Sequence, residues 1–330
     1  MKKILGTSQF ALFALFVVTW LVFGFINPGI FSLAGFYSLT RACIVPAILS
    51  LAPMILIVQG GIDISFAAVA AFSSYVTIFI YTQNKIDAPL IVIFLTAAVF
   101  AVALELINWF FIDKIDIPPL ITTLASQTLI KGGVLAFVST SFIYSLPSAM
   151  QSFGTAYIAT AAFPNGTESV LHVSVFFVAT LYAIMYFILE YTSFGRSIYA
   201  IGDDASAARR AGIKVSRVRL YSFIIVGFIC AIGGVIHNAL MRATLPWPPD
   251  IVGQELTNIA AVFLGCGTAK QARGSVVGTL LGVVLLRFIG TNLIMIGVPS
   301  FWQRAVSGVI ILAGLIIQTS DRRKKVHNRG

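Results

Sequence analysis

The segment Pro89–Ile112, PLIVIFLTAAVFAVALELINWFFI, decides the structural class of this protein. It is longer than the roughly 20 apolar residues that cross the hydrocarbon core of a membrane. Glu105 is the one charged residue within it. A helix on the surface of a soluble domain needs a polar face, which this segment lacks. The segment therefore predicts a transmembrane helix.

Similar apolar runs recur along the chain and predict about ten spans. They lie at about Phe10–Ile26, Cys43–Gln59, Ile64–Tyr81, Pro89–Ile112, Pro118–Val138, Val170–Tyr191, Tyr221–Met241, Val252–Gly265, Val276–Asn292 and Phe301–Gln318. Hydrophobic residues make up 58% of the 330 residues and charged residues only 10%. A soluble domain has roughly a quarter charged residues, so a soluble enzyme, a disordered chain and a nucleic-acid-binding domain are excluded. The predicted fold is an all-α polytopic membrane protein.

The net charge of +10 has a topological origin. With the N-terminus in the cytoplasm, sixteen of the 22 Lys and Arg residues fall on the cytoplasmic side, three outside and three within spans. This bias is what the positive-inside rule expects, so both termini are predicted to be cytoplasmic, with residues 319–330 as a basic tail. The first span is expected to be a retained helix rather than a cleaved signal, and residues 1–330 to form a single transmembrane domain.

The longest predicted cytoplasmic connection, residues 192–220, contains signals for a short helix. Asp203 and Asp204 follow Gly202 and can cap free backbone N–H groups at a helix start. Arg209 suits the negative end of the helix dipole, and Gly212 suits a left-handed stop. These residues predict an amphipathic cytosolic helix between Gly202 and Gly212.

The same connection resembles the cytoplasmic loop of ribose-type permeases of ATP-binding-cassette importers, which are branched-chain-permease-like membrane subunits. The pattern T-x-x-G-R-x-I-x-A-x-G-x-x-x-x-A-A-x-x-x-G-I is matched by Thr192, Gly195, Arg196, Ile198, Ala200, Gly202, Ala207, Ala208, Gly212 and Ile213. The resemblance implies that the short helix docks into a groove of an ATPase subunit. The implied coupling residues are Gly202, Asp203, Asp204, Ala207, Ala208, Arg209 and Gly212.

Two further segments extend the resemblance over most of the chain. Pro53–Ser65 is similar to the family's G-I-D-L-S signature, and Glu255–Thr268 with Gly274–Thr279 is similar to its E-L-x-x-I-A-A-V-x-L-G-G and G-S-x-x-G-T stretches. The chain departs from the pattern at Cys266 and at the Asp203–Asp204 pair. These departures suit one half of a heterodimer, similar to the paired permeases of autoinducer-2 importers, and leave homodimer and heterodimer open.

Irregular backbone near the membrane boundary marks a candidate translocation path or gate. Its residues are Gln59, Gly60, Gly61, Asp63, Ser65, Gly265 and Gly267. Asp63 has two interpretations, a cap for the helix that follows and a direct contact with substrate. The Val252–Gly265 run is too short for an upright span and predicts a short or re-entrant helix.

Several embedded polar and small residues have a structural interpretation. Glu105 and Asn108 share a helical face, and pairing within the protein is favoured over a proton relay. Gly274, Gly278 and Gly282 form a small-residue stripe for close helix packing. The three cysteines and three histidines are too scattered to form a metal site.

The resemblance implies a permease subunit that moves a sugar or sugar-like solute across the bacterial inner membrane. Its implied partners are a second permease copy or paralogue, two ATP-binding-cassette domains and a periplasmic or lipid-anchored solute-binding protein. The chain has no G-x-x-x-x-G-K-S/T phosphate loop, so ATP is expected to be bound and hydrolysed by the partners, with no cofactor or enzymatic activity here. The alternative is an ion-coupled secondary transporter, with Asp63 and Glu105 as its coupling sites.

Overall fold

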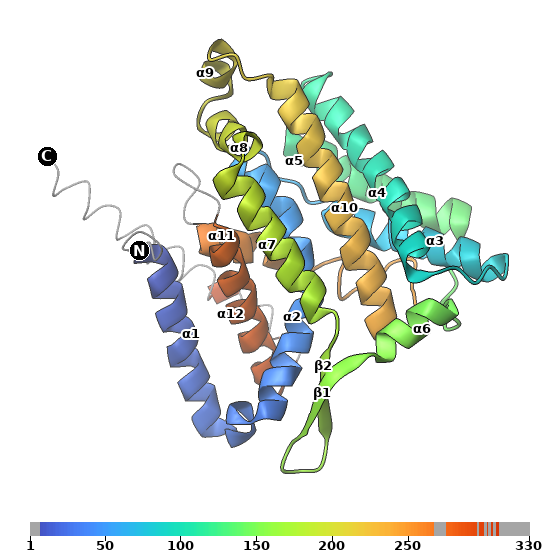
Figure 1. Ribbon diagram of the computed structural model, residues 1–330, viewed down its shortest axis with the longest axis vertical. Helices are drawn as coiled ribbons and strands as arrows, with labels where there is room; N and C mark the ends of the chain where they lie inside the picture. Colours follow the sequence, from blue (N-terminus) through green and yellow to red (C-terminus); the bar gives the residue numbers. More distant parts are fainter. Residues whose placement is uncertain are drawn as a thin grey trace, which may run out of the picture. The chain divides into compact units, whose positions relative to one another are not determined.

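The computed structural model describes residues 7–266, 275–295, 297–299, 302, 305, 308 and 309, and its ribbon is shown in Figure 1. The elements are α1 Thr7–Ile26, η1 Pro28–Phe31, α2 Leu33–Val58, α3 Phe66–Gln83, α4 Leu90–Asp113, α5 Pro119–Gly133, η2 Val134–Val138, α6 Ser148–Thr155, β1 Tyr157–Ala162, β2 Glu168–His172, α7 Val175–Tyr191, α8 Ser193–Asp203, α9 Ala205–Arg210, α10 Val215–Met241, α11 Glu255–Cys266 and α12 Val276–Met295. The described chain is therefore mainly helical, as predicted.

Six described helices are long and apolar enough to cross a membrane, and they lie at Leu33–Val58, Phe66–Gln83, Leu90–Asp113, Pro119–Val138, Val215–Met241 and Val276–Ile294. A seventh results if α7 and α8, which meet at a bend of 72°, are counted as one span. The apolar helices over Leu12–Ile26 and Glu255–Gly265 are shorter. The structure thus supports six or seven spans. The predicted count of about ten and the cytoplasmic termini stay predictions, because residues 1–6 and most of 301–330 lie outside the described part.

Two helices begin earlier than the apolar runs that predicted them. Helix α2 begins at Leu33 rather than Cys43 and includes Arg41. Helix α10 begins at Val215 rather than Tyr221 and includes Arg217 and Arg219. Backbone hydrogen bonding continues beyond the hydrocarbon boundary, whereas a hydropathy pattern marks only the apolar part.

A β-hairpin that the hydropathy pattern did not predict follows α6. Its strands are antiparallel, with Ala162 opposite Glu168 and Tyr157 opposite His172. Within the turn the Asn165 side chain accepts a hydrogen bond from the Thr167 N–H at 3.1 Å, and Gly166 has φ of +80°. Asn and Gly supply the conformation that such a turn requires, and this signal identifies the hairpin in retrospect.

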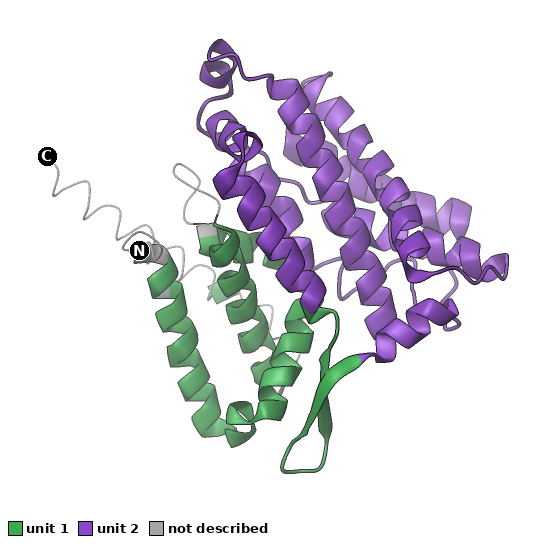
Figure 2. Ribbon diagram, viewed as in Figure 1, with its two compact units in different colours: residues 1–47, 157–175, 257–330 green, residues 48–156, 176–256 purple. Residues whose placement is uncertain are grey.

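The chain forms two compact units, coloured separately in Figure 2. Unit 2 comprises residues 48–156 and 176–256. In its core α10 packs against α4 and α3. A Cβ atom added at Gly227 of α10 would lie 2.8 Å from Val102 Cα of α4, and one added at Gly234 would lie 2.2 Å from the Ala70 carbonyl oxygen of α3. Small residues therefore allow these helix backbones to approach closely.

Unit 1 comprises residues 1–47, 157–175 and 257–330. In its described part α1 packs against α12, and α12 lies close to α11. A Cβ atom at Gly278 would lie 2.0 Å from the Gly265 carbonyl oxygen, and one at Gly282 would lie 2.1 Å from that of Ala261. The predicted packing stripe is confirmed at Gly278 and Gly282, while Gly274 lies outside the described residues. Helix α11 has 12 residues and is about 18 Å long, too short to span a core of about 30 Å.

Candidate functional site

The connection between α7 and α10 folds into two helices rather than one. The Thr192 hydroxyl caps α8 by accepting the Gly195 N–H at 3.1 Å. The Asp204 carboxylate caps α9 by accepting the N–H groups of Ser206 and Ala207 at 2.8 and 3.0 Å. Gly212 ends the segment with φ of +86°. The capping role of Asp204 and the stop at Gly212 are confirmed, but Asp203 lies in the last turn of α8 and does not cap the short helix.

A small apolar cluster fixes α9 against its neighbours. Ile201 of α8, Ala208 of α9 and Val215 of α10 are buried together. Ala207 and Arg209, which precede and follow Ala208, are exposed. The loop is therefore held as a compact body, with Ala208 inside it and Ala207 available to a partner.

The Asp204 cap carries a negative charge at the positive end of a helix. Hydrogen bonds from the Ala207 and Ser206 backbone and from the Ser206 hydroxyl hold the pKa of Asp204 below its usual value. Because these bonds favour the ionised form, the carboxylate stays charged at any physiological pH. The start of α9 is thus anchored by a permanent charge.

Helix α8 lies directly against the end of α2. A Cβ atom added at Gly202 would lie 1.8 Å from the Val58 carbonyl oxygen, so only glycine permits this contact. Gly60, with φ of +86°, turns the chain at the end of α2, and a Cβ there would meet Gly202 as its nearest neighbour. Gln59 also donates a hydrogen bond to the Ser222 hydroxyl of α10 at 2.5 Å. The loop that carries α8 and α9 is thus in contact with the Gln59–Ser65 segment.

The Gln59–Ser65 segment ends on a buried carboxylate. Asp63 is 1% exposed, and its Oδ1 atom accepts the backbone N–H and the hydroxyl of Ser65, both at 2.7 Å. These bonds reach Ser65, the N-cap residue just before α3, and no side-chain cap bond is formed there, so both interpretations of Asp63 stay predictions. Burial raises the pKa of Asp63 to about 6, although the hydrogen bonds from Ser65 and Phe66 act in the opposite direction.

A buried polar network extends from Asp63 into α4 and α5. Asn108 of α4 donates to the Ser65 hydroxyl at 3.0 Å and to Glu105 Oε2 at 3.2 Å, and it accepts the Ser126 hydroxyl of α5 at 2.5 Å. Glu105 and Asn108 are almost fully buried. The predicted pairing of Glu105 with Asn108 is confirmed, and Asn108 is the centre of the network.

The network leaves two carboxylate oxygens without partners. Asp63 Oδ2 and Glu105 Oε1 are buried and accept no hydrogen bond within the described chain. Neither carboxyl group forms an ion pair with a described Lys, Arg or His. Buried unpaired carboxylates are costly, so this site is sensitive to any change in its packing.

A cavity of about 160 Å³ adjoins this segment. It is lined by Leu56, Gln59, Gly60, Gly61, Ile62, Asp63, Ile112, Pro119, Thr123, Arg219 and Phe223. Four of the predicted path residues, Gln59, Gly60, Gly61 and Asp63, line this cavity. Ser65, the fifth predicted path residue in unit 2, donates a hydrogen bond to Asp63. The structure therefore brings together the first half of the predicted path.

Comparison with known proteins identifies the family. Residues 35–315 match the family described as branched-chain amino acid transport system / permease component. The chain belongs to this family. The permease is therefore a membrane transport subunit and an integral protein of the cell membrane, as the spans indicate.

The curated relatives of the permease match it over nearly its full length. The ribose import permease protein RbsC of Bacillus subtilis is 30% identical over 94% of this chain and 91% of the relative. The probable ABC transporter permease protein YphD of Escherichia coli is 28% identical over 96% and 93%. The autoinducer 2 import system permease protein LsrC of Yersinia enterocolitica is 25% identical over 94% and 81%. The resemblance stated from the sequence is confirmed, and no solved structure matches the chain.

The second half of the predicted path lies in unit 1 of the permease. Gly265 is buried in α11 and packs against Gly278, as described above. Gly267 lies outside the described residues. That the Gly60 and Gly265 regions form a pair along one path stays a prediction. Within the described residues no group of three or more His, Cys, Asp or Glu side chains could hold a metal ion.

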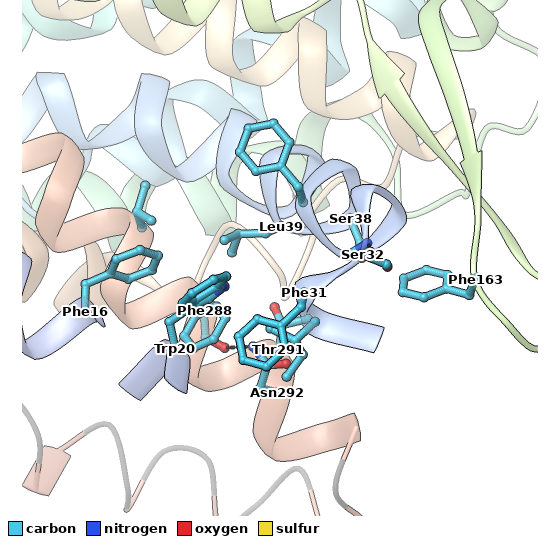
Figure 3. A pocket seen from close by; sticks show the side chains of 14 residues that line it. Phe16, Trp20, Phe31, Ser32, Ser38, Leu39, Phe163, Phe288, Thr291 and Asn292 are labelled. Atoms are coloured by element: carbon cyan, nitrogen blue, oxygen red, sulfur yellow. Dashed lines mark hydrogen bonds between the residues drawn. The ribbon is translucent and has the colours of Figure 1, made fainter. Parts of the chain in front are cut away.

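A larger cavity of about 370 Å³ lies within unit 1 and contains none of the predicted site residues. Its walls include Phe16 and Trp20 of α1, Phe31 of η1 and Phe288 of α12, and Figure 3 shows these rings around it. Trp20 and Phe31 meet edge to face, with centroids 4.5 Å apart. The sequence did not predict this cavity, because its rings come from distant segments.

Sequence reasoning also missed several residues of the polar network. Thr123 and Ser126 of α5 and Ser222 of α10 each bind the predicted segment or Asn108. Hydroxyl groups are common in membrane helices, where they often bind the backbone of their own helix. Their positions in α5 and α10 therefore carried no signal that distinguished them from packing residues.

Proposed function

We propose that this permease is the transmembrane subunit of an ATP-binding-cassette importer for a sugar or sugar-like solute. The observation that carries the proposal is the full-length similarity to the ribose import permease protein, at 30% identity. The similarity to an autoinducer 2 import permease extends the candidate solutes to small sugar-like molecules. The proposed location is the bacterial inner membrane.

The loop of α8 and α9 is proposed to receive the motion of an ATPase partner. Ala207 and Arg209 are exposed on α9 and would contact the ATPase, whereas Ala208 joins α9 to the rest of the loop. Asp203 is the last residue of α8, Asp204 caps α9, and Gly212 follows the end of α9. A compact body transmits displacement that a flexible loop would absorb, which suits a rigid-body mechanism.

The displacement would reach the membrane part through Gly202. Its contact with Val58 leaves no space between α8 and α2, so a shift of α8 must move the Gln59–Asp63 segment. That segment lines the small cavity and is tied to α10 by the bond between Gln59 and Ser222. In the proposed cycle this movement gates the path at Gln59, Gly60, Gly61, Asp63, Ser65, Gly265 and Gly267.

The remaining parts of the importer would be supplied by partners. They are a second permease copy or paralogue, two ATP-binding-cassette domains and a solute-binding protein. ATP would be bound by the ATPase domains, with no cofactor on this chain. The relationship to a probable ABC transporter permease favours this assembly over an ion-coupled carrier that acts alone.

The docking proposal can be tested with Ala207→Glu, which adds a carboxylate to the exposed face of α9. Thr167→Glu is the control, because it adds the same group at an exposed position of the hairpin. We expect Ala207→Glu to lose co-purification with the ATPase and ATP-driven uptake, and Thr167→Glu to keep both. Normal ATPase binding and uptake by Ala207→Glu would contradict the proposal. Ala208 is unsuitable for this test, since a carboxylate there would disrupt the buried cluster.

A further inference from the structure

A basic groove lies between the end of α4 and the start of α10 in unit 2. Its volume is about 720 Å³, and it is lined by Trp109, Lys114, Arg209, Gly212, Ile213, Lys214, Val215, Ser216, Arg217 and Leu220. Four of these side chains are cationic and none is acidic. The groove therefore concentrates positive charge in a concave surface, which attracts anions.

Three of the four cations have no acidic partner. Arg209, Lys214 and Arg217 are exposed and form no ion pair within residues 7–266 and 275–295. Lys114 lies 3.7 Å from Asp113, an acidic residue that also contacts Arg219 and the Ser216 hydroxyl and does not line the groove. The charges of these three cations are thus not neutralised by the described chain.

One residue of the groove wall carries a hydrogen-bond donor without a partner among the described residues. The indole Nε1 of Trp109 is shielded from water and has no partner among the described residues. The Lys114 ammonium lies 5.3 Å from the centroid of the Trp109 rings, so the charge and the indole are neighbours. A buried indole N–H normally finds an acceptor, and an anionic oxygen in the groove would supply one.

The lining residues straddle the end of the membrane-spanning helices. Trp109 and Leu220 belong to α4 and α10, two of the candidate spans, and together with Ile213 and Val215 they give the groove an apolar side. Lys114 follows α4, and Arg209 and Lys214 precede α10. A cationic rim above an apolar wall at a membrane boundary matches a phospholipid, whose phosphate lies above its acyl chains.

We propose that this groove binds an anionic phospholipid from the leaflet on the side of the α8–α9 loop. The headgroup phosphate lies among Lys114, Lys214 and Arg217 and accepts the Trp109 indole N–H. The glycerol and upper acyl chain lie along Leu220. An ATPase surface is the less suitable occupant, because Trp109 lies within the apolar run of α4, where a soluble partner does not reach.

The test measures lipid binding to the full-length permease purified without its ATPase. Native mass spectrometry compares retention of phosphatidylglycerol with that of phosphatidylcholine. We expect retention of phosphatidylglycerol to be the greater. The paired variant Lys214→Gln with Arg217→Gln should lower phosphatidylglycerol affinity about fivefold for each charge removed. The control pair Arg196→Gln with Arg210→Gln removes the same charge from exposed positions outside the groove and should bind as the unmodified protein does.

Trp109→Phe provides an independent variant, because it keeps the aromatic wall and deletes only the N–H donor. A several-fold loss of phosphatidylglycerol affinity is expected, with phosphatidylcholine retention unchanged. Equal retention of the two lipids, or equal losses in the groove and control pairs, would overturn the proposal. Displacement of the lipid by millimolar inorganic phosphate would identify a free phosphate site instead. If the groove pair bound lipid normally but no longer co-purified with the ATPase, the groove would be an ATPase-binding surface instead.

Discussion

The α8–α9 loop and the Asp63 network lie in the same unit and are built by opposite means. The loop is formed by bonds between near neighbours, such as Asp204 with Ala207. The network is formed by Asn108, Ser65 and Ser126, which come from three separate elements. A locally built body can move as a whole, whereas a buried network fixes one arrangement of helices. This difference suits a loop that transmits motion as one body to a membrane core with a defined packing.

The largest expected effect is at the centre of the network. Asn108→Ala removes three hydrogen bonds and leaves buried groups of Ser65, Glu105 and Ser126 without that partner. The free energy of unfolding should fall by about 3–5 kcal/mol. Denaturant titration of the purified protein measures this value. Asn84→Ala, at an exposed position after α3, is the control and should change stability by less than about 0.5 kcal/mol.

The next effect concerns the pH dependence of the network. The pKa of Asp63 is raised from its ordinary value of 3.8 to about 6, so the folded state binds more protons than the unfolded state between these values. The contribution of Asp63 to stability should therefore fall as the pH rises from about 4 to about 6.

Asp63→Asn removes this titration and keeps an oxygen that can accept the Ser65 bonds. The difference in unfolding free energy between the variant and the unmodified protein should grow by roughly 3 kcal/mol across that pH window. Thermal or denaturant unfolding at several pH values measures it. Asp116→Asn, at an exposed position, should keep the profile of the unmodified protein. A parallel profile for Asp63→Asn would show that Asp63 does not titrate in this range.

A smaller effect on stability is expected where the two regions touch. Gly202→Ala places a Cβ atom 1.8 Å from the Val58 carbonyl oxygen and must push α8 away from α2. The expected loss is about 1–3 kcal/mol, typical of overpacking. ATP-driven uptake should fall with it. Gly132→Ala is the matched control, since no atom lies within 4 Å of its added Cβ. Normal uptake by Gly202→Ala would show that the contact between α8 and α2 is not needed to couple ATP hydrolysis to transport.

The smallest effect on stability is expected within the loop. Asp204→Ala removes the cap of α9, so the helix should fray while the membrane core stays folded. Uptake should fall several-fold with little change in the unfolding midpoint. Asp204→Ser supplies another capping oxygen and should restore uptake. A large drop in the midpoint for Asp204→Ala would show that the loop also stabilises the core.

The sequence predicted those features whose cause is local. The capping oxygen of Asp204 and the left-handed Gly212 lie next to the backbone groups that they affect, so their residue types were sufficient. The pairing of Glu105 with Asn108 followed from their spacing on one helix. The prediction that Asp203 caps the short helix was wrong. Either of two adjacent carboxylates can cap a helix, and the residue pattern does not show where α8 ends.

The hairpin and the helix starts were less accessible to sequence reasoning. A hydropathy pattern marks where a chain is apolar, so it missed the polar first turns of α10 and the strands beside Gly166. The number of spans is similarly limited, because length and apolarity alone do not distinguish a span from a short packed helix such as α11.

The sequence by itself determined that this protein lies in a membrane, because the free energy of transfer depends on composition and length. It also determined the local caps and the small-residue stripe of α12. Only the tertiary structure decided that Asn108 bonds Ser65 and Ser126, that Gly202 meets Val58, and that four cations share one groove. These contacts join residues far apart in the chain, and their distances are set by helix packing, which no local pattern encodes.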